Sequence, residues 1–163
     1  MEHVTEGDLE RPSQWGPVVW RVLHSAATLR DTAALERVLR DLGQLLPCKY
    51  CRRSLRCLWP RVRALDVATA SERVWILHNM VSFKIHCSQG ATVTEALARS
   101  APLAVLRRYR PRLGAQDERA ARRVARVIAT CARRRGAAAQ RNGTLARFQR
   151  DFDALLTALR PSR

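Results

Sequence analysis

Two cysteines separated by two residues, Cys48 and Cys51, are the residues of this chain most suited to chemistry. A pair at this spacing can close a disulfide at the start of a helix, where the positive end of the helix dipole also lowers the pKa of a thiol. Lys49, Arg52 and Arg53 add positive charge, which again favours the thiolate. Because the thiolate attacks disulfides and donates electrons, the pattern predicts a redox-active dithiol.

The same cysteine pair has two other interpretations, half of a zinc site or two small buried residues. Zinc would need two further ligands, and Cys57, His86 and Cys87 are the candidates. The chain has no second Cys-x-x-Cys and no His-x3–5-His pair, so the usual zinc spacing is missing. We therefore predict no metal site, and zinc stays the less favoured alternative.

A second group of candidates follows the pattern Trp75-x-x-His78-Asn79 and continues to Ser82 and Lys84. On a helix, Trp75, His78 and Ser82 share one face, and the other two flank it. An aromatic ring, an imidazole, an amide and a cation on one helix could hold a planar, phosphorylated ligand. Taken alone, the pattern is more typical of a helix with a buried tryptophan and a hydrogen-bonded core histidine.

A third group lies near the start of the chain, in Trp15-Gly16-Pro17-x-x-Trp20-x-x-x-His24. Trp20 and His24 are one helical turn apart and therefore face the same way. They could line a ligand site, and they could equally be part of an aromatic core.

In their order along the chain, these three motifs resemble those of the Erv/ALR family of FAD-linked sulfhydryl oxidases. They read Trp-Gly-Pro-x-x-Trp-x-x-x-His, Pro-Cys-x-x-Cys-Arg and Trp-x-x-His-Asn-x-Val. The opening motif is most similar to the compact forms encoded by large DNA viruses. The resemblance covers about residues 14–100. It implies an all-α fold, a four-helix bundle with a short fifth helix, usually as a homodimer.

The resemblance also implies where the cofactor and the substrate would meet the chain. FAD would lie inside the bundle, Cys51 would be next to the flavin, and Cys48 would exchange with the incoming dithiol. The implied cofactor-binding residues come from the two aromatic motifs: Gly16, Trp20, His24, Trp75, His78, Asn79, Ser82 and Lys84.

The chain departs from the family pattern in four respects. Ser82 replaces the last Asn of the usual His-Asn-x-Val-Asn, and Pro17 stands where Arg is common. Many cellular members carry a structural disulfide whose first position is near Cys57, but Trp75 occupies the second position, so this bridge is expected to be absent. The late tryptophans of the family are missing as well, because no Trp follows Trp75.

The predicted activity is that of an enzyme that makes disulfides in protein dithiols and passes the electrons through FAD to oxygen, giving hydrogen peroxide. A second, shuttle dithiol is not evident, because Cys87 and Cys131 are single cysteines. We therefore expect a separate electron donor, a thioredoxin-like or small thiol protein. Two alternatives remain: a basic zinc- or nucleic-acid-binding helical module, and a non-catalytic structural protein with a flavin-binding fold.

Helices must position these residues, because the 163-residue chain is rich in Ala, Leu and Arg and has little strand-like alternation. With 47% hydrophobic residues it is not a disordered chain. Apolar periodicity and capping signals predict seven helices, at about 15–29, 33–46, 48–58, 70–85, 92–107, 116–135 and 144–159. We divide the chain into a polar leader (1–13), an oxidase domain (14–103) and a basic helical extension (104–163), with a linker at 136–143.

The net charge of +16 is concentrated in the predicted extension, which holds 16 of the 30 basic residues and four of the 14 acidic ones. Such a charge can attract nucleic acid or another anionic partner. Aromatic residues for base stacking are nearly absent there, so we favour packing of the extension on the bundle. Residues 1–13 carry no signal-peptide pattern, and no stretch approaches the ~20 apolar residues of a membrane span. The expected location is cytoplasmic, or the host cytoplasm or virion if the chain is viral.

Overall fold

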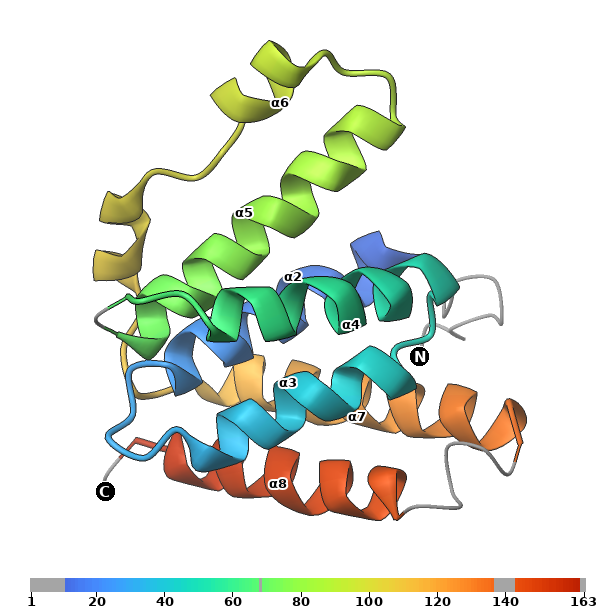
Figure 1. Ribbon diagram of the computed structural model, residues 1–163. Helices are drawn as coiled ribbons and strands as arrows, with labels where there is room; N and C mark the ends of the chain where they lie inside the picture. Colours follow the sequence, from blue (N-terminus) through green and yellow to red (C-terminus); the bar gives the residue numbers. More distant parts are fainter. Residues whose placement is uncertain (1–10, 68, 137–142, 162–163) are drawn as a thin grey trace.

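The computed structural model describes residues 11–67, 69–136 and 143–161 (Figure 1). Its elements are α2 (Pro12–Ala26), α3 (Ala33–Leu45), α4 (Lys49–Arg63), α5 (Ala70–Ser88), α6 (Val93–Ala98), the 3₁₀ helix η1 (Leu103–Arg108), α7 (Ala115–Arg134) and α8 (Thr144–Ala158). These ranges contain no strand, which confirms the predicted all-α class. None of the described helices is both long enough and apolar enough to cross a membrane.

One hydrophobic core is shared by α2, α3, α4, α5, α7 and α8. In Figure 1, α3, α7 and α8 form the lower layer, α2 and α4 lie above them, and α5 crosses obliquely and projects outward with α6. The principal packing pairs are α3 with α4 and α8, α2 with α5 and α7, and α4 with α5. Because α7 and α8 cover α2 and α3, the two C-terminal helices complete the core on which the cysteine-bearing helix rests.

Helices α7 and α8 present apolar stripes to the rest of the fold. On α8, Phe148, Phe152 and Leu155 are buried, as is Leu159 at its C-cap, and these residues recur at the spacing that predicts a helix over 144–159. The boundary predicted at residues 103 and 104 falls inside η1. Most of the predicted leader and of the predicted linker lies outside the described residues.

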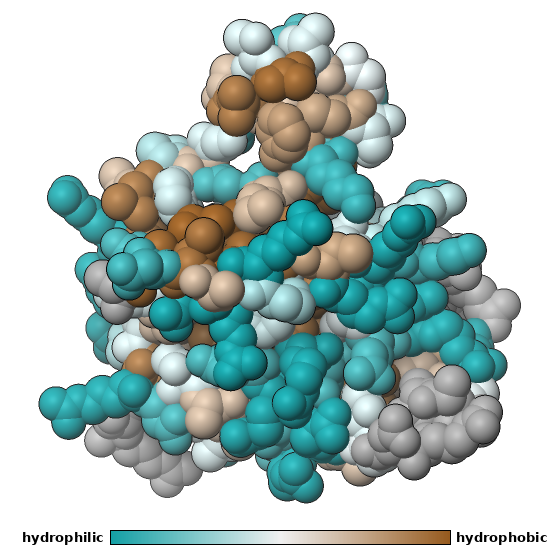
Figure 2. Space-filling model, in the orientation of Figure 1, coloured by the Kyte–Doolittle hydropathy of each residue, from teal (hydrophilic) through white to brown (hydrophobic). Residues whose placement is uncertain are grey.

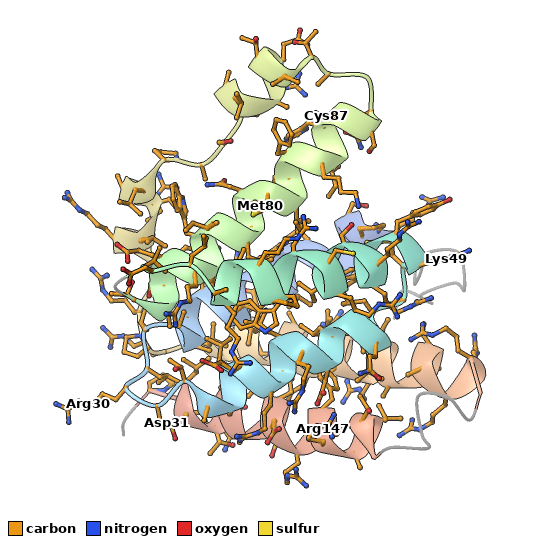
Figure 3. The ribbon with its side chains drawn as sticks, in the orientation of Figure 1. Arg30, Asp31, Lys49, Met80, Cys87 and Arg147 are labelled. Atoms are coloured by element: carbon orange, nitrogen blue, oxygen red, sulfur yellow. A yellow bond between two sulfur atoms is a disulfide. The ribbon has the colours of Figure 1, made fainter. Side chains whose placement is uncertain are left out.

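Two arginine–aspartate pairs fix α8 against α3. Nε and Nη2 of Arg147 donate to the carboxylate of Asp41 at 2.9 and 2.6 Å, as the position of Arg147 between the two helices in Figure 3 illustrates. Arg37 binds Asp151 in the same way, with its Nε 2.8 Å from the carboxylate. Asp41 is fully buried and Asp151 nearly so, and a buried carboxylate needs such a partner. The pairs therefore set the register of α8 on α3.

Prolines explain two helix boundaries that the sequence predicts wrongly. We expected α2 to begin at Trp15, but it begins at Pro12, which suits the first turn of a helix, and it continues through Pro17. We expected α4 to end before Pro60, but it continues to Arg63. A proline there removes one backbone hydrogen bond, and burial of Trp59 and Val62 holds the last turn in place.

A third predicted boundary is wrong because a proline interrupts the helix. The helix predicted over 92–107 is two elements, α6 and η1, separated at Pro102. The residue before a proline disfavours the helical conformation, and Pro102 itself has an extended backbone, so residues 99–102 separate the two elements. The start of α6 is well determined by a capping box, in which Thr92 and Glu95 each bind the other's backbone amide.

Candidate functional site

A cavity of about 1040 Å³ lies between α2, α3, α4 and α5. Its volume is at the upper end of the roughly 300–1,000 Å³ typical of ligand pockets. Six of the predicted site residues line it: Gly16, Trp20, Cys48, Cys51, His78 and Ser82. The three motifs, which are separated in sequence, therefore meet around one space.

The cysteine pair stands at the start of α4 and on the wall of this cavity. Cys48 and Cys51 form a disulfide with their Cα atoms 5.2 Å apart. Cys48 is the N-cap of α4, and its Sγ accepts the backbone amide of Cys51 at 3.2 Å. Both residues are half-buried, whereas Tyr50 between them is 77% exposed. The pair is therefore accessible from outside as well as from the cavity.

Two arginines hold the turn that carries Cys48. Nη1 of Arg52 donates to the carbonyl oxygens of Leu46 and Pro47 at 2.6 and 2.8 Å. Nη2 of Arg135, from the end of α7, donates to the carbonyl oxygen of Leu45 at 2.6 Å. Cations at the C-terminal end of a helix satisfy its last carbonyls, here those of α3. Sequence reasoning missed Arg135, because no local signal marks a contact across 90 residues.

Four aromatic rings form a stack beside the cavity. Trp20 stacks on His78 with ring centroids 4.1 Å apart, and His24 stacks on Tyr109 at 4.3 Å. Nε2 of His24 and Nδ1 of His78 share a hydrogen bond of 2.9 Å, which joins the two halves. We call Trp20, His78, His24 and Tyr109 the ring stack. Tyr109, between η1 and α7, is the member that sequence reasoning missed.

Both histidines of the ring stack are neutral at pH 7. Burial lowers the pKa of His24 to about 4, with a smaller contribution from the charge of His78. Burial likewise lowers the pKa of His78 to about 4. Each neutral ring has one donor and one acceptor nitrogen, so the shared hydrogen bond uses one nitrogen of each. The pair is thus held together as uncharged hydrogen-bonding rings.

The low pKa values of His24 and His78 predict that the folded chain is less stable in acid. The pKa of each histidine is lower in the folded chain than the ordinary value near 6.5, so the unfolded chain binds more protons between about pH 6.5 and 4. The free energy of unfolding should be highest above pH 6.5 and fall through that window, by at most about 1.4 kcal/mol per pH unit for each histidine. Urea unfolding at a series of pH values measures this, and His24→Gln should reduce the slope. An equal reduction in the control His86→Gln would contradict the assignment.

Two buried polar atoms lack a hydrogen-bond partner in the described chain, and one of them belongs to the cavity wall. Nε1 of Trp15 has no hydrogen-bond partner among the described residues, and Trp15 lines the cavity. Nδ1 of His24 is also buried without a partner in the described chain. A ligand with hydrogen-bonding ring atoms could satisfy a donor of this kind, because an unpaired buried polar group costs about 1–3 kcal/mol. The cavity residues therefore fit a planar heterocycle such as a flavin.

Three predicted residues on α5 do not line the cavity. Nε1 of Trp75 and Nδ2 of Asn79 both donate to the carbonyl oxygen of Ala101, at 2.9 and 3.1 Å, and the amide of Ala101 donates back to Asn79. They hold the segment between α6 and η1 on α5. Nζ of Lys84 donates to Oγ of Ser54 on α4 at 2.7 Å. His24 reaches the cavity only through His78 and Tyr109.

The candidate zinc ligands do not form a cluster in the described part of the chain. No group of three His, Cys, Asp or Glu side chains that could hold a metal ion occurs there. Cys57 is exposed on α4, and Cys87 lies near the outer end of α5, as Figure 3 shows.

Comparison of the chain with known protein families, with curated proteins and with solved structures gives no match. The function proposed below therefore rests on the cavity, on the disulfide in its wall and on the motif resemblance.

Proposed function

We propose that this chain is an FAD-dependent thiol oxidase of the kind that the Erv/ALR resemblance implies. The observation that carries the proposal is the Cys48–Cys51 disulfide in the wall of a cavity lined by the two aromatic motifs. A cavity whose wall holds both an electron-accepting disulfide and stacked aromatic rings suits a planar redox cofactor.

The dithiol chemistry proceeds in two exchanges. A substrate thiolate attacks Sγ of Cys48, a substrate–Cys48 disulfide forms, and Cys51 leaves as a thiolate. The second substrate thiol then attacks the substrate sulfur, which releases Cys48 and leaves the substrate with a new disulfide. Two electrons have moved from the substrate to the cysteine pair, and the two thiol protons pass to solvent or to the cysteines.

FAD would supply the two-electron acceptor that reoxidises the pair and passes the electrons to oxygen. The residues of this chain that would hold it are Gly16, Trp20, His78 and Ser82, which line the cavity. The indole N–H of Trp15 is a further donor available to a flavin ring. Arg52 and Arg135 would keep the turn before Cys48 in place while the disulfide opens and closes.

The partner that brings the dithiol would approach beside Tyr50. This side chain and that of Lys49, the two residues between the cysteines, are both exposed, and Lys49 points into solvent in Figure 3. Exposed tyrosines are common anchors in protein–protein contacts. A thioredoxin-like or small thiol protein remains the predicted donor, and a homodimer remains the predicted assembly.

The visible absorption spectrum of the purified protein tests the proposal. A yellow protein should lose its flavin absorbance on addition of dithiothreitol and recover it in air, with hydrogen peroxide formed as thiol is consumed. The measurement needs no knowledge of the natural substrate, because a small dithiol can reduce an exposed disulfide. A folded, colourless protein that FAD cannot reconstitute would overturn the proposal.

A further inference from the structure

A second cleft, of about 560 Å³, lies next to the ring stack, between the end of α2, η1 and the start of α7. Four arginines line it: Arg21, Arg108, Arg110 and Arg112. Asp117 is the one carboxylate among its lining residues. We call this space the arginine cleft. Its lining carries more positive than negative charge. The neighbouring cavity that holds the Cys48–Cys51 disulfide, which we call the dithiol cavity, is mostly apolar.

Three of the four guanidinium groups, those of Arg108, Arg110 and Arg112, have no anionic partner in the described chain. Arg21 pairs with Asp117, and Arg110 donates to the carbonyl oxygens of Arg107 and Tyr109. Arg108 and Arg112 are exposed, and no ion pair of theirs occurs among the described residues. Elsewhere on α7 the pattern differs, since Arg122 binds two carboxylates. The arginine cleft therefore keeps positive charge that an anion could neutralise.

The N-terminal end of α7 adds to the positive electrostatic potential of the arginine cleft. Gly114, the N-cap of the 20-residue helix, lines the cleft and provides no side-chain cap. The positive end of the helix dipole and the first backbone N–H groups favour anions, phosphates in particular. Paired guanidinium groups are likewise well matched to the oxygens of phosphate.

The arginine cleft and the dithiol cavity adjoin. Arg21 and Tyr109 line both spaces, and Tyr109 stacks on His24 within the ring stack. One molecule with a ring system in the dithiol cavity and an anionic group in the arginine cleft would therefore pass along Tyr109. Dinucleotides have this layout, with a diphosphate between two ring systems.

We propose that the arginine cleft binds a diphosphate group, that of the dinucleotide whose flavin lies in the dithiol cavity. The inference rests on the proposed function and adds to it Arg108 and Arg112, from outside the motif region, as residues that would select a dinucleotide over a phosphate-free flavin. Arg108 and Arg112 contact the diphosphate, and Arg21 exchanges Asp117 for it.

The test compares FAD with riboflavin, which has the same ring system and no phosphate. Binding of each to the flavin-free protein is measured by equilibrium dialysis, for the wild type and for Arg108→Gln/Arg112→Gln. The matched control is Arg119→Gln/Arg123→Gln, which removes the same charge from exposed positions of α7 outside the cleft. We expect the cleft variant to weaken FAD binding roughly tenfold or more and to leave riboflavin binding unchanged.

Inorganic pyrophosphate separates this inference from the proposed function. It should compete with FAD in the wild type, and less well in the cleft variant. Equal losses for FAD and riboflavin, or an equal loss of FAD in the control variant, would overturn the diphosphate site while leaving the flavin assignment intact. A wild type that binds neither flavin would overturn the proposed function and the dinucleotide with it. Pyrophosphate binding that still depends on Arg108 and Arg112 would then show that the diphosphate belongs to a different ligand.

Discussion

Replacing Cys51 with serine is expected to abolish thiol oxidation, with a loss of turnover on the order of 10³-fold or more. Cys48→Ser should have the same effect on turnover, because a single cysteine cannot form the Cys48–Cys51 disulfide whose cleavage accepts the electron pair. The two variants should differ in what accumulates. Cys51→Ser keeps the Cys48 thiol, which should attack the disulfide of an oxidised substrate and hold it as a mixed disulfide, because no Cys51 thiolate is left to release it; Cys48→Ser should trap far less.

Cys57→Ser is the matched control for this experiment. Cys57 lies on the same helix, is exposed and forms no disulfide, so its replacement should leave turnover unchanged. Oxygen consumption with dithiothreitol gives the rates, and mass spectrometry of the unreduced protein identifies the trapped adducts. Retained turnover in Cys51→Ser would exclude the dithiol mechanism, even if the protein still binds FAD.

The second large effect is expected in the C-terminal helices, far from the cysteines. Arg147→Ala leaves the carboxylate of Asp41 fully buried without its bidentate partner. Breaking a buried ion pair costs about 3–5 kcal/mol, and we expect a value near the lower limit because Nε of Arg40 remains 3.7 Å from Asp41. Chemical denaturation measures the change in the free energy of unfolding. Since a domain is stable by roughly 5–15 kcal/mol, this is a large fraction of the total.

A control on the same helix and a compensating variant make this result specific. Arg150→Ala removes an exposed arginine that only approaches Asp151, at 3.9 Å, and should change the free energy of unfolding by less than about 0.5 kcal/mol. Asp41→Leu/Arg147→Met replaces the pair with apolar side chains and should recover much of the loss. If Arg147→Ala were as stable as Arg150→Ala, the α3–α8 pair would not hold the extension on the core.

The sequence predicts most helices because their apolar residues recur at helical spacing and their caps are local. Thr69 and Glu72 form the capping box that starts α5, and the apolar stripe of α8 begins within two residues of its helix start. Pro60 and Pro102 have opposite outcomes because tertiary packing decides what a proline does. Burial of Trp59 and Val62 holds the turn at Pro60, and nothing comparable follows Pro102, since η1 has no buried residue.

The site is predicted less completely than the fold, for a physical reason. Helical spacing tells which residues of α5 share a face, but not which neighbour that face meets. His78 and Ser82 meet the dithiol cavity, whereas Trp75, one turn earlier, meets the carbonyl of Ala101. Tyr109 and Arg135 carry no local signal at all, because their roles depend on how α7 is brought back against α2 and α3.

The sulfur that begins α4 also connects the stability of this fold to its redox state. Sγ of Cys48 accepts the amide of Cys51, and a thiolate accepts such a hydrogen bond more strongly than a disulfide sulfur does. The disulfide closes a loop of only a few residues, so its cross-link restrains the unfolded chain little. By thermodynamic linkage, whatever stabilises the thiolate in the folded chain makes the pair a stronger oxidant. Most disulfide proteins become less stable on reduction, whereas reduction of this cysteine pair would stabilise α4.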